Sequence, residues 1–268
     1  MKPLEYWNSE GFEISSYKYS LKDRINKSYK TSGSDNTELC TYTYNELGFR
    51  GDSIKKEGFK VMSLGCSFTE GVAVNNHETW PYQFCKLIPN GVNFNFGTGG
   101  RSGDFVVRCL MSYYDLIKPD LVLIMYPHSF RREFYTKDNY VEPFMPTSSW
   151  GFMEETEEGI KIQKNLVELQ NENEDFINWY KNHLLIKYFL KDKKCNWLWN
   201  GFRNIPIDYN EPNRFDGNYG IFIDLGVDGA HPGPKHNKKY SNDLYEYINK
   251  NFRNYLPEDL IALKQNLI

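Results

Sequence analysis

Three short stretches of the chain are rich in apolar residues and end in small or polar ones. They are Phe59–Leu64, Val92–Phe96 and Leu121–Tyr126, and the last is apolar or aromatic at every position. A short run of this kind, bounded by turn residues, is typical of a buried strand, and a continuous one indicates a central parallel strand. A fourth strand is predicted at about 196–199.

Helical periodicity occupies the segments between these strands. Apolar side chains recur every three or four positions at about 105–116, 173–191 and 238–252, and a shorter helix is predicted at about 80–87. Strands that alternate with helices favour a parallel sheet covered on both faces. The pattern therefore predicts a three-layer α/β/α sandwich with a mostly parallel, flavodoxin-like sheet.

The length of 268 residues suits one large domain. Residues 1–52, polar with scattered aromatics, are predicted to form an N-terminal arm packed on the core. Residues 53–268 would form the main domain. Within it, the segment at about 134–194 begins with irregular, proline-interrupted sequence and is a candidate insertion or lid.

Charge and cysteine content narrow the function classes. The net charge is −3 and the pI is about 6.0, so the composition lacks the excess of basic residues that is typical of nucleic-acid-binding proteins. Five cysteines without CxxC spacing favour a reducing compartment. The first residues lack the apolar stretch of a signal peptide, and no run is long enough to span a membrane. We expect a cytoplasmic protein, with export by another route left open; the sequence does not indicate an oligomeric state.

Ser67 is the candidate nucleophile. It follows the strand that stops near Gly65, at the sheet edge where open α/β folds hold ligands and catalytic groups. Asp228 and His231 stand three residues apart, so they can pair within one loop. Such a carboxylate fixes the tautomer of a histidine that takes the proton of a serine. An ordinary turn is the alternative interpretation of Ser67.

The glycines around Ser67 and at 97–103 are partly similar to two other known motifs. The turn at 97–103 joins a strand to a helix as phosphate-binding loops do, but it lacks the P-loop lysine, and Ser102 replaces the last glycine of G-x-G-x-x-G. Its glycines can instead present backbone N–H groups to an oxyanion. The α/β-hydrolase elbow G-x-S-x-G is not matched, because Thr69 stands at the final glycine.

Several polar residues have structural interpretations. His77 is near Ser67 in sequence but has no carboxylate to orient it, so we interpret it as a loop residue. Arg50 could contact substrate, although a structural salt bridge is the favoured interpretation. Asp228, His231 and His236 are too few and too loosely spaced for zinc. We expect no metal and no organic cofactor.

Together the motifs resemble those of the SGNH (GDSL) hydrolase family. Gly65–Thr69 is similar to its nucleophile block, with Cys66 where Asp is usual, and Asn95–Gly100 is similar to its second block. Asp228–Pro232 is similar to the last block, and Asn45–Gly51 to the "GFRG" lead-in found in many members. The match in order and spacing covers about residues 42–130 and 224–252.

The resemblance implies a serine ester hydrolase that works through an acyl-enzyme. Ser67 would attack, His231 would act as base and then acid, and Asp228 would orient His231. Backbone N–H groups of Ser67 and Gly100 would hold the oxyanion. The implied substrate is a small-molecule ester or acylated glycan from which a short acyl group is removed.

The third block of the family is altered in this chain. It normally holds an asparagine that donates to the oxyanion, whereas here His128 or Ser129 could donate and Arg131 could reach the same pocket. Two alternatives stay open: a non-catalytic carbohydrate-binding or structural protein on this scaffold, and an acyltransferase that keeps the triad but excludes water. Cys66 is an alternative nucleophile, but Ser67 holds the family position.

Overall fold

The computed structural model describes residues 24–32, 39–135, 141–144, 161, 164–165, 167–169, 171–201, 213–217 and 221–257. A five-stranded sheet lies at the centre of this part of the chain. Its spatial order is β3 (Arg50–Gly51), β5 (Gly91–Asn95), β4 (Phe59–Gly65), β6 (Leu121–Tyr126), β9 (Asn196–Gly201). Strands β5, β4, β6 and β9 are parallel, and β3 pairs antiparallel with β5 at one edge.

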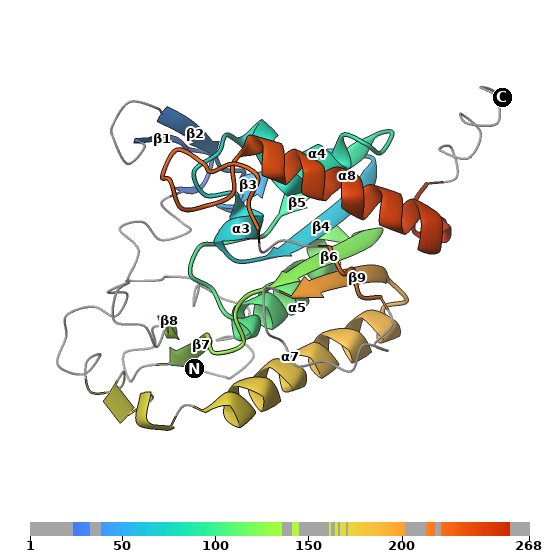
Figure 1. Cartoon of the computed structure of the whole chain (residues 1–268). Helices are drawn as coiled ribbons and strands as arrows, with labels where there is room; N and C mark the ends of the chain where they lie inside the picture. Colours follow the sequence, from blue (N-terminus) through green and yellow to red (C-terminus); the bar gives the residue numbers. More distant parts are fainter. Residues whose placement is uncertain are drawn as a thin grey trace.

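Helices cover both faces of the sheet (Figure 1). Helices α5 (Gly103–Ile117) and α7 (Glu172–Asp192) pack on one face. Helices α4 (Trp80–Cys85) and α8 (Pro234–Asn251) pack on the other. The predicted three-layer α/β/α sandwich with a mostly parallel sheet is confirmed.

Strand β6 explains why two helical layers are needed. All six of its residues are buried. Leu121, Leu123 and Met125 join the core beneath α4 and α8, whereas the three residues that alternate with them join the core beneath α5 and α7. Since burying one such side chain contributes about 1.5–3 kcal/mol, a sheet with either face open would lose much of its stability.

The shorter elements surround this core. Among the described residues, two antiparallel ribbons lie outside the main sheet: β1 (Ser28–Ser32) with β2 (Leu39–Thr43), and β7 (Arg132–Tyr135) with β8 (Val141–Phe144). The short helices α3 (Ser67–Glu70) and η1 (Asn76–Glu78) lie between β4 and α4, and η3 (Arg253–Tyr255) follows α8. Of the predicted insertion or lid at about 134–194, most of residues 136–170 lies outside the described residues, whereas the last part forms α7, which packs on the sheet. The short helix predicted after Pro257 also lies outside the described residues. The division into an arm and a main domain stays a prediction.

The strand order places the predicted site. Numbered along the chain, the parallel strands follow the order 2-1-3-4, as in flavodoxin-like sheets. Strands β5 and β6 therefore lie on opposite sides of β4, and ligands of such folds bind outside the carboxyl ends of the strands at this switch point. Ser67 follows β4 and His128 follows β6, so both lie at the carboxyl edge of the sheet by the switch point.

Arg50 holds the turn that follows α3. Its side chain is fully buried, with 1% exposure. Its guanidinium donates to the carbonyl oxygens of Gly71 and Val74 and to Oδ1 of Asn76, and it stacks over the ring of Tyr42 at 4.2 Å. No salt bridge of Arg50 is present among the described residues. The role is structural, but the acceptors are backbone carbonyls and an amide, because the turn presents oxygens that need a buried donor.

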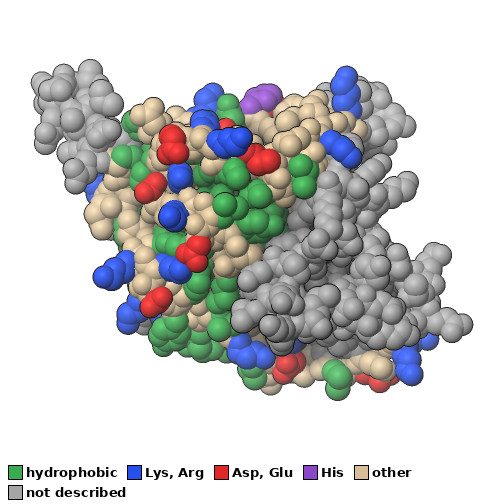
Figure 2. All heavy atoms as spheres, turned by 180° about the vertical axis from the view of Figure 1, so that it is seen from behind, with side chains coloured by type: hydrophobic (Ala, Val, Ile, Leu, Met, Phe, Trp, Pro, Cys, Tyr) green, Lys and Arg blue, Asp and Glu red, His purple; other side chains and the backbone are tan. Residues whose placement is uncertain are grey.

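The surface carries charges of both signs. On the face shown in Figure 2, Lys and Arg side chains are interspersed with Asp and Glu side chains. This mixture agrees with the near balance of 32 basic and 35 acidic residues. Among the described residues, no helix has the length and apolar character to cross a membrane.

We expect Arg50→Met to lower the free energy of unfolding by about 3 kcal/mol or more, because two buried carbonyls lose their donor and each costs about 1–3 kcal/mol. Urea denaturation measures this. Lys56→Met is the control: Lys56 pairs with Asp52 but its side chain is 49% exposed, so the loss should stay within about 1 kcal/mol. Equal losses in the two variants would contradict the role of Arg50.

Candidate active site

Ser67 stands at the corner between β4 and α3. Cys66 precedes it as the N-cap residue, and Gly71 in the left-handed conformation ends the helix by donating its N–H to the carbonyl of Ser67. A side chain at Gly65 would collide with Thr69 of the same helix and with the carbonyl of Met125. The glycine of the G-x-S pattern therefore lets α3 fold directly against the strand ends, and Ser67 is left 8% exposed.

The glycine-rich turn after β5 lies against α3. A side chain at Gly97 would collide with the backbone of Thr69 and Glu70. Asn95 joins the two segments: its Nδ2 donates to the carbonyl of Thr69 at 2.7 Å, and its Oδ1 accepts from the N–H of Gly97 at 2.9 Å. The structure therefore brings the predicted oxyanion turn, which includes Gly100, against the helix that carries Ser67.

Asp228 and His231 form a hydrogen-bonded pair. Nδ1 of His231 lies 2.6 Å from Oδ2 of Asp228, and Oδ1 accepts the backbone N–H groups of Ala230 and His231 at 3.0 Å. Burial opposes the charge of Asp228, but these hydrogen bonds outweigh it and hold the pKa of the carboxyl below its ordinary value. The carboxylate is therefore ionised at neutral pH, as the orienting member of a catalytic triad must be.

The loop that carries this pair is fixed at both ends. The N–H of Gly226 donates to the carbonyl of His231 at 2.8 Å, which closes the loop on itself. Asp224 accepts the N–H groups of Lys235 and His236 and so caps α8. The N–H of Val227 donates to the carbonyl of Ala73, in the turn that follows α3.

His231 lies beside α3. Its ring centroid is 5.6 Å from that of Phe68, the residue next to Ser67. Phe68 also packs against Phe222, with centroids 5.8 Å apart. No hydrogen bond between Ser67 and His231 is present among the described residues; in enzymes without substrate such contacts are often long and tighten on binding.

The loop after β6 holds the candidates for the altered third block. His128 stacks on Phe130 with centroids 4.8 Å apart, and its carbonyl accepts the N–H of Arg131 at 3.1 Å. Ser129 lies in the turn between them and is partly exposed. Nε and Nη1 of Arg131 are buried and make no hydrogen bond to any described residue. Which of the three meets a substrate stays a prediction.

The other histidines stay outside this arrangement. His77 lies in η1 with its side chain 67% exposed, consistent with a surface loop residue. His236 is buried and packs against Phe222, with centroids 5.3 Å apart. Within the described ranges, no group of three or more His, Cys, Asp or Glu side chains is placed to hold a metal ion.

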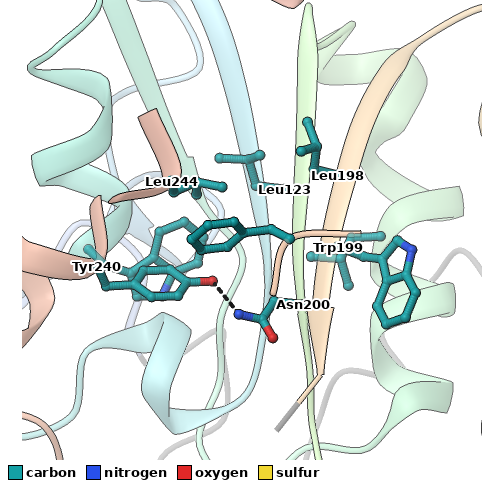
Figure 3. Close-up of a pocket in the computed structure, with 9 residues that line it drawn as sticks. Leu123, Leu198, Trp199, Asn200, Tyr240 and Leu244 are labelled. Atoms are coloured by element: carbon teal, nitrogen blue, oxygen red, sulfur yellow. Dashed lines mark hydrogen bonds between the residues drawn. The ribbon is translucent and has the colours of Figure 1, made fainter. Parts of the chain in front are cut away.

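A small cavity lies elsewhere, between the sheet and α8 (Figure 3). Its walls are mainly apolar, including Leu123, Leu198 and Leu244. Asn200 crosses it and donates to the hydroxyl of Tyr240 at 3.4 Å. None of its lining residues is a candidate catalytic residue, so this cavity belongs to the core packing beneath α8.

Two residues of the site were missed by sequence reasoning. Phe68 places its ring between His231 and Phe222, and the carboxylate of Glu70 accepts the N–H of Gly99 at 2.6 Å. Both lie inside the nucleophile motif, but the identity of their partners depends on segments that are distant in sequence. The position of Glu70, three residues after Ser67, places it near the candidate site but does not indicate that it binds Gly99.

Comparisons with known proteins returned similar folds but no close relative. No protein-family model matches the chain, and no curated protein matches it. Among solved structures, a proposed lipolytic protein of the G-D-S-L family from Desulfitobacterium hafniense is 17% identical, with a TM-score of 0.31 over 70% of this chain and 99% of that chain.

Two Bacteroides proteins are similar to a comparable degree. A proposed acylhydrolase from Bacteroides fragilis is 16% identical, with a TM-score of 0.30 over 73% of this chain and 91% of its own. A GDSL-like lipase from Bacteroides thetaiotaomicron is 16% identical, with a TM-score of 0.29 over 72% and 88%.

The lowered pKa of Asp228 predicts a pH-dependent stability. A depressed carboxyl pKa stabilises the fold fully above its ordinary value, 3.8, and this contribution is lost as the pH falls through the lower folded-state value. Asp228→Asn should therefore melt below the wild type at neutral pH, and the gap should close only below about pH 4.

Melting temperatures of both proteins between about pH 7 and pH 2.5 measure this gap. Asp115→Asn is the control, because Asp115 is 78% exposed and pairs only at the surface with Lys193. If the difference in melting temperature between the wild type and Asp228→Asn stays constant or widens on acidification, the lowered pKa assigned to Asp228 is refuted.

Proposed function

We propose that the protein is a serine ester hydrolase that acts through an acyl-enzyme. The observation that carries this proposal is the 2.6 Å contact between Asp228 and His231, made on a loop whose histidine ring lies beside Phe68. An oriented histidine next to a serine at a strand end is the arrangement that activates a hydroxyl nucleophile.

The proton path follows from which imidazole nitrogen is engaged. Because Nδ1 of His231 is held by Asp228, Nε2 is the nitrogen left for Ser67. Nε2 would take the proton of Ser67 Oγ during attack on the ester carbonyl and return it to the leaving alcohol. The ionised Asp228 would stabilise the imidazolium between these two transfers.

Backbone donors would hold the oxyanion. Ser67 is the first residue of α3, and the first N–H groups of a helix have no partner within it. Gly100 supplies a second N–H from the turn that packs against α3. Preorganised donors of this kind cost no reorganisation as charge develops on the carbonyl oxygen.

Water would complete the cycle by attacking the acyl-enzyme, with His231 as the base. If a second alcohol took the place of water, the same residues would catalyse acyl transfer, so product analysis separates the two. The proposed substrate is a small ester or acylated glycan. A substrate group that accepts hydrogen bonds would pair with the buried nitrogens of Arg131.

Covalent labelling tests the nucleophile. A fluorophosphonate probe should label the wild type at Ser67, and Ser67→Ala should remove labelling and ester hydrolysis together, because the other hydroxyl of this corner, that of Thr69, is fully buried. Mass spectrometry of the labelled peptide identifies the modified residue.

Cys66→Ala is the matched control, since Cys66 is adjacent and only 2% exposed. It should keep labelling and hydrolysis within about threefold, a difference of under 0.7 kcal/mol in barrier. Loss of labelling in Cys66→Ala but not in Ser67→Ala would transfer the role to Cys66. An unlabelled wild type would favour the non-catalytic alternative.

The third oxyanion donor is tested at His128 and Ser129. If one of them donates only in the transition state, its alanine variant should lower kcat by about 10²–10³-fold with little change in KM. Residual activity should remain, because the Ser67 and Gly100 donors are backbone groups.

Melting temperatures separate this effect from simple loss of folding. A variant that melts lower but keeps its kcat would show that the side chain only closes the turn. If neither variant lowers kcat by more than about threefold, Arg131→Met becomes the next variant to assay, and an unchanged kcat there would remove a side-chain donor from the mechanism.

A further inference from the structure

The carboxylate of Glu70 ties the helix of the nucleophile to the turn of the oxyanion. It lies three residues after Ser67, and its side chain is 6% exposed. Its Oε2 accepts the backbone N–H of Gly99 at 2.6 Å. From this contact we infer that Glu70 is a positioning residue, which sets the peptide whose N–H would meet the oxyanion; the inference rests on the proposed function.

The hydrogen bonds of the glycine-rich turn single out one N–H group. Gly97 donates to Oδ1 of Asn95, and Thr98 donates to the carbonyl of Gly65 at 3.2 Å. Gly99 donates to Glu70, and Arg101 donates to the carbonyl of Thr98 at 3.4 Å. Within residues 97–101, the N–H of Gly100 is the one with no acceptor among the described residues, so it is the group available to a ligand.

Glu70 acts on this group through one peptide unit. Gly100 has φ +73°, a left-handed conformation in which its N–H direction depends on how the preceding residue is held. The Gly99 hydrogen bond fixes that preceding residue against α3. Without it, two glycines in succession would have little to restrict their dihedral angles, and the donor would lose its fixed direction.

Neighbouring groups stabilise the charge of this carboxylate. Buried carboxylates are costly unless they are paired, and Nη1 of Arg24 lies 3.3 Å from Oε1. The hydroxyl of Tyr44 donates to the same oxygen at 3.4 Å. Burial, together with the charge of Glu70, raises the pKa of Tyr44, so its hydroxyl stays protonated as a donor at neutral pH. Oε2 is thereby left to Gly99.

A set of three variants tests this role. Glu70→Met keeps similar bulk but has no oxygen to accept from Gly99. Glu70→Gln keeps an acceptor oxygen and should rescue the contact. Tyr44→Phe is the matched control, because it removes a donor to the other carboxylate oxygen and leaves the Gly99 bond in place.

Kinetics should separate the variants. For Glu70→Met we expect kcat, and the rate of fluorophosphonate labelling, to fall by at least about tenfold with KM within about twofold; complete loss of one oxyanion donor, about 10²–10³-fold, is the upper limit. Glu70→Gln and Tyr44→Phe should stay within about threefold of the wild type. A normal kcat in folded Glu70→Met, or equal losses in all three variants, would overturn the inference.

Amide hydrogen exchange followed by NMR supplies a readout that needs no activity. The Gly99 amide should exchange at least about tenfold faster in Glu70→Met, a change of about 1.4 kcal/mol in protection. The Gly97 amide, which is bonded to Asn95, serves as the internal reference. Unchanged exchange at Gly99 would overturn the inference. If Glu70→Met does not fold, faster Gly99 exchange or a tenfold lower kcat in Glu70→Gln would overturn it.

The same experiment separates failure of the inference from failure of the proposed function. A wild type that neither hydrolyses esters nor binds the probe would refute the proposed function, whatever happens at Glu70. Gly99 exchange would still report whether Glu70 holds the turn. An active wild type with normal kcat and normal Gly99 exchange in Glu70→Met refutes the role of Glu70 alone.

Discussion

The close approach of α3 to the ends of β4 and β5 is the constraint on which the rest of the site depends. Helix α3 is only four residues long and could not persist by its own hydrogen bonds. Gly65 and Gly97 allow its backbone to lie where any side chain would collide, and Asn95 joins it to the glycine-rich turn. The position of Ser67 is therefore set by the packing of α3 against the ends of the strands.

Two loops distant in sequence are assembled on this helix. The turn after α3 receives the guanidinium of Arg50 on one side and the N–H of Val227 on the other. Arg50 lies before β4, and Val227 adjoins Asp228 in the loop before α8. These two segments therefore both bind carbonyl oxygens of the turn that follows α3. The second loop is the glycine-rich turn, which Glu70 holds. Ser67, the loop of His231 and the glycine-rich turn are thus joined at α3 or at the turn that follows it.

The loop of His231 and the loop after β6 are held by different kinds of contact. Asp228 and Asp224 each accept two backbone N–H groups, so the loop of His231 is determined by local hydrogen bonds. The loop after β6 has one described backbone bond from Arg131 to His128 and a ring stack. In that loop His128 and Ser129 stand where the motifs that the sequence resembles hold an asparagine.

The sequence by itself determined the layers, the strands of the parallel sheet and the short loop that pairs Asp228 with His231, because each follows from local spacing: apolar periodicity, or two partners three residues apart. Only the tertiary structure decided that Arg50 binds carbonyls rather than a carboxylate, that Arg50–Gly51 adds an edge strand, and that Glu70 meets Gly99. These contacts join residues between 21 and 45 positions apart. They form only once the crossovers of the sheet have brought the segments together, so the spacing of residues along the chain does not predict them.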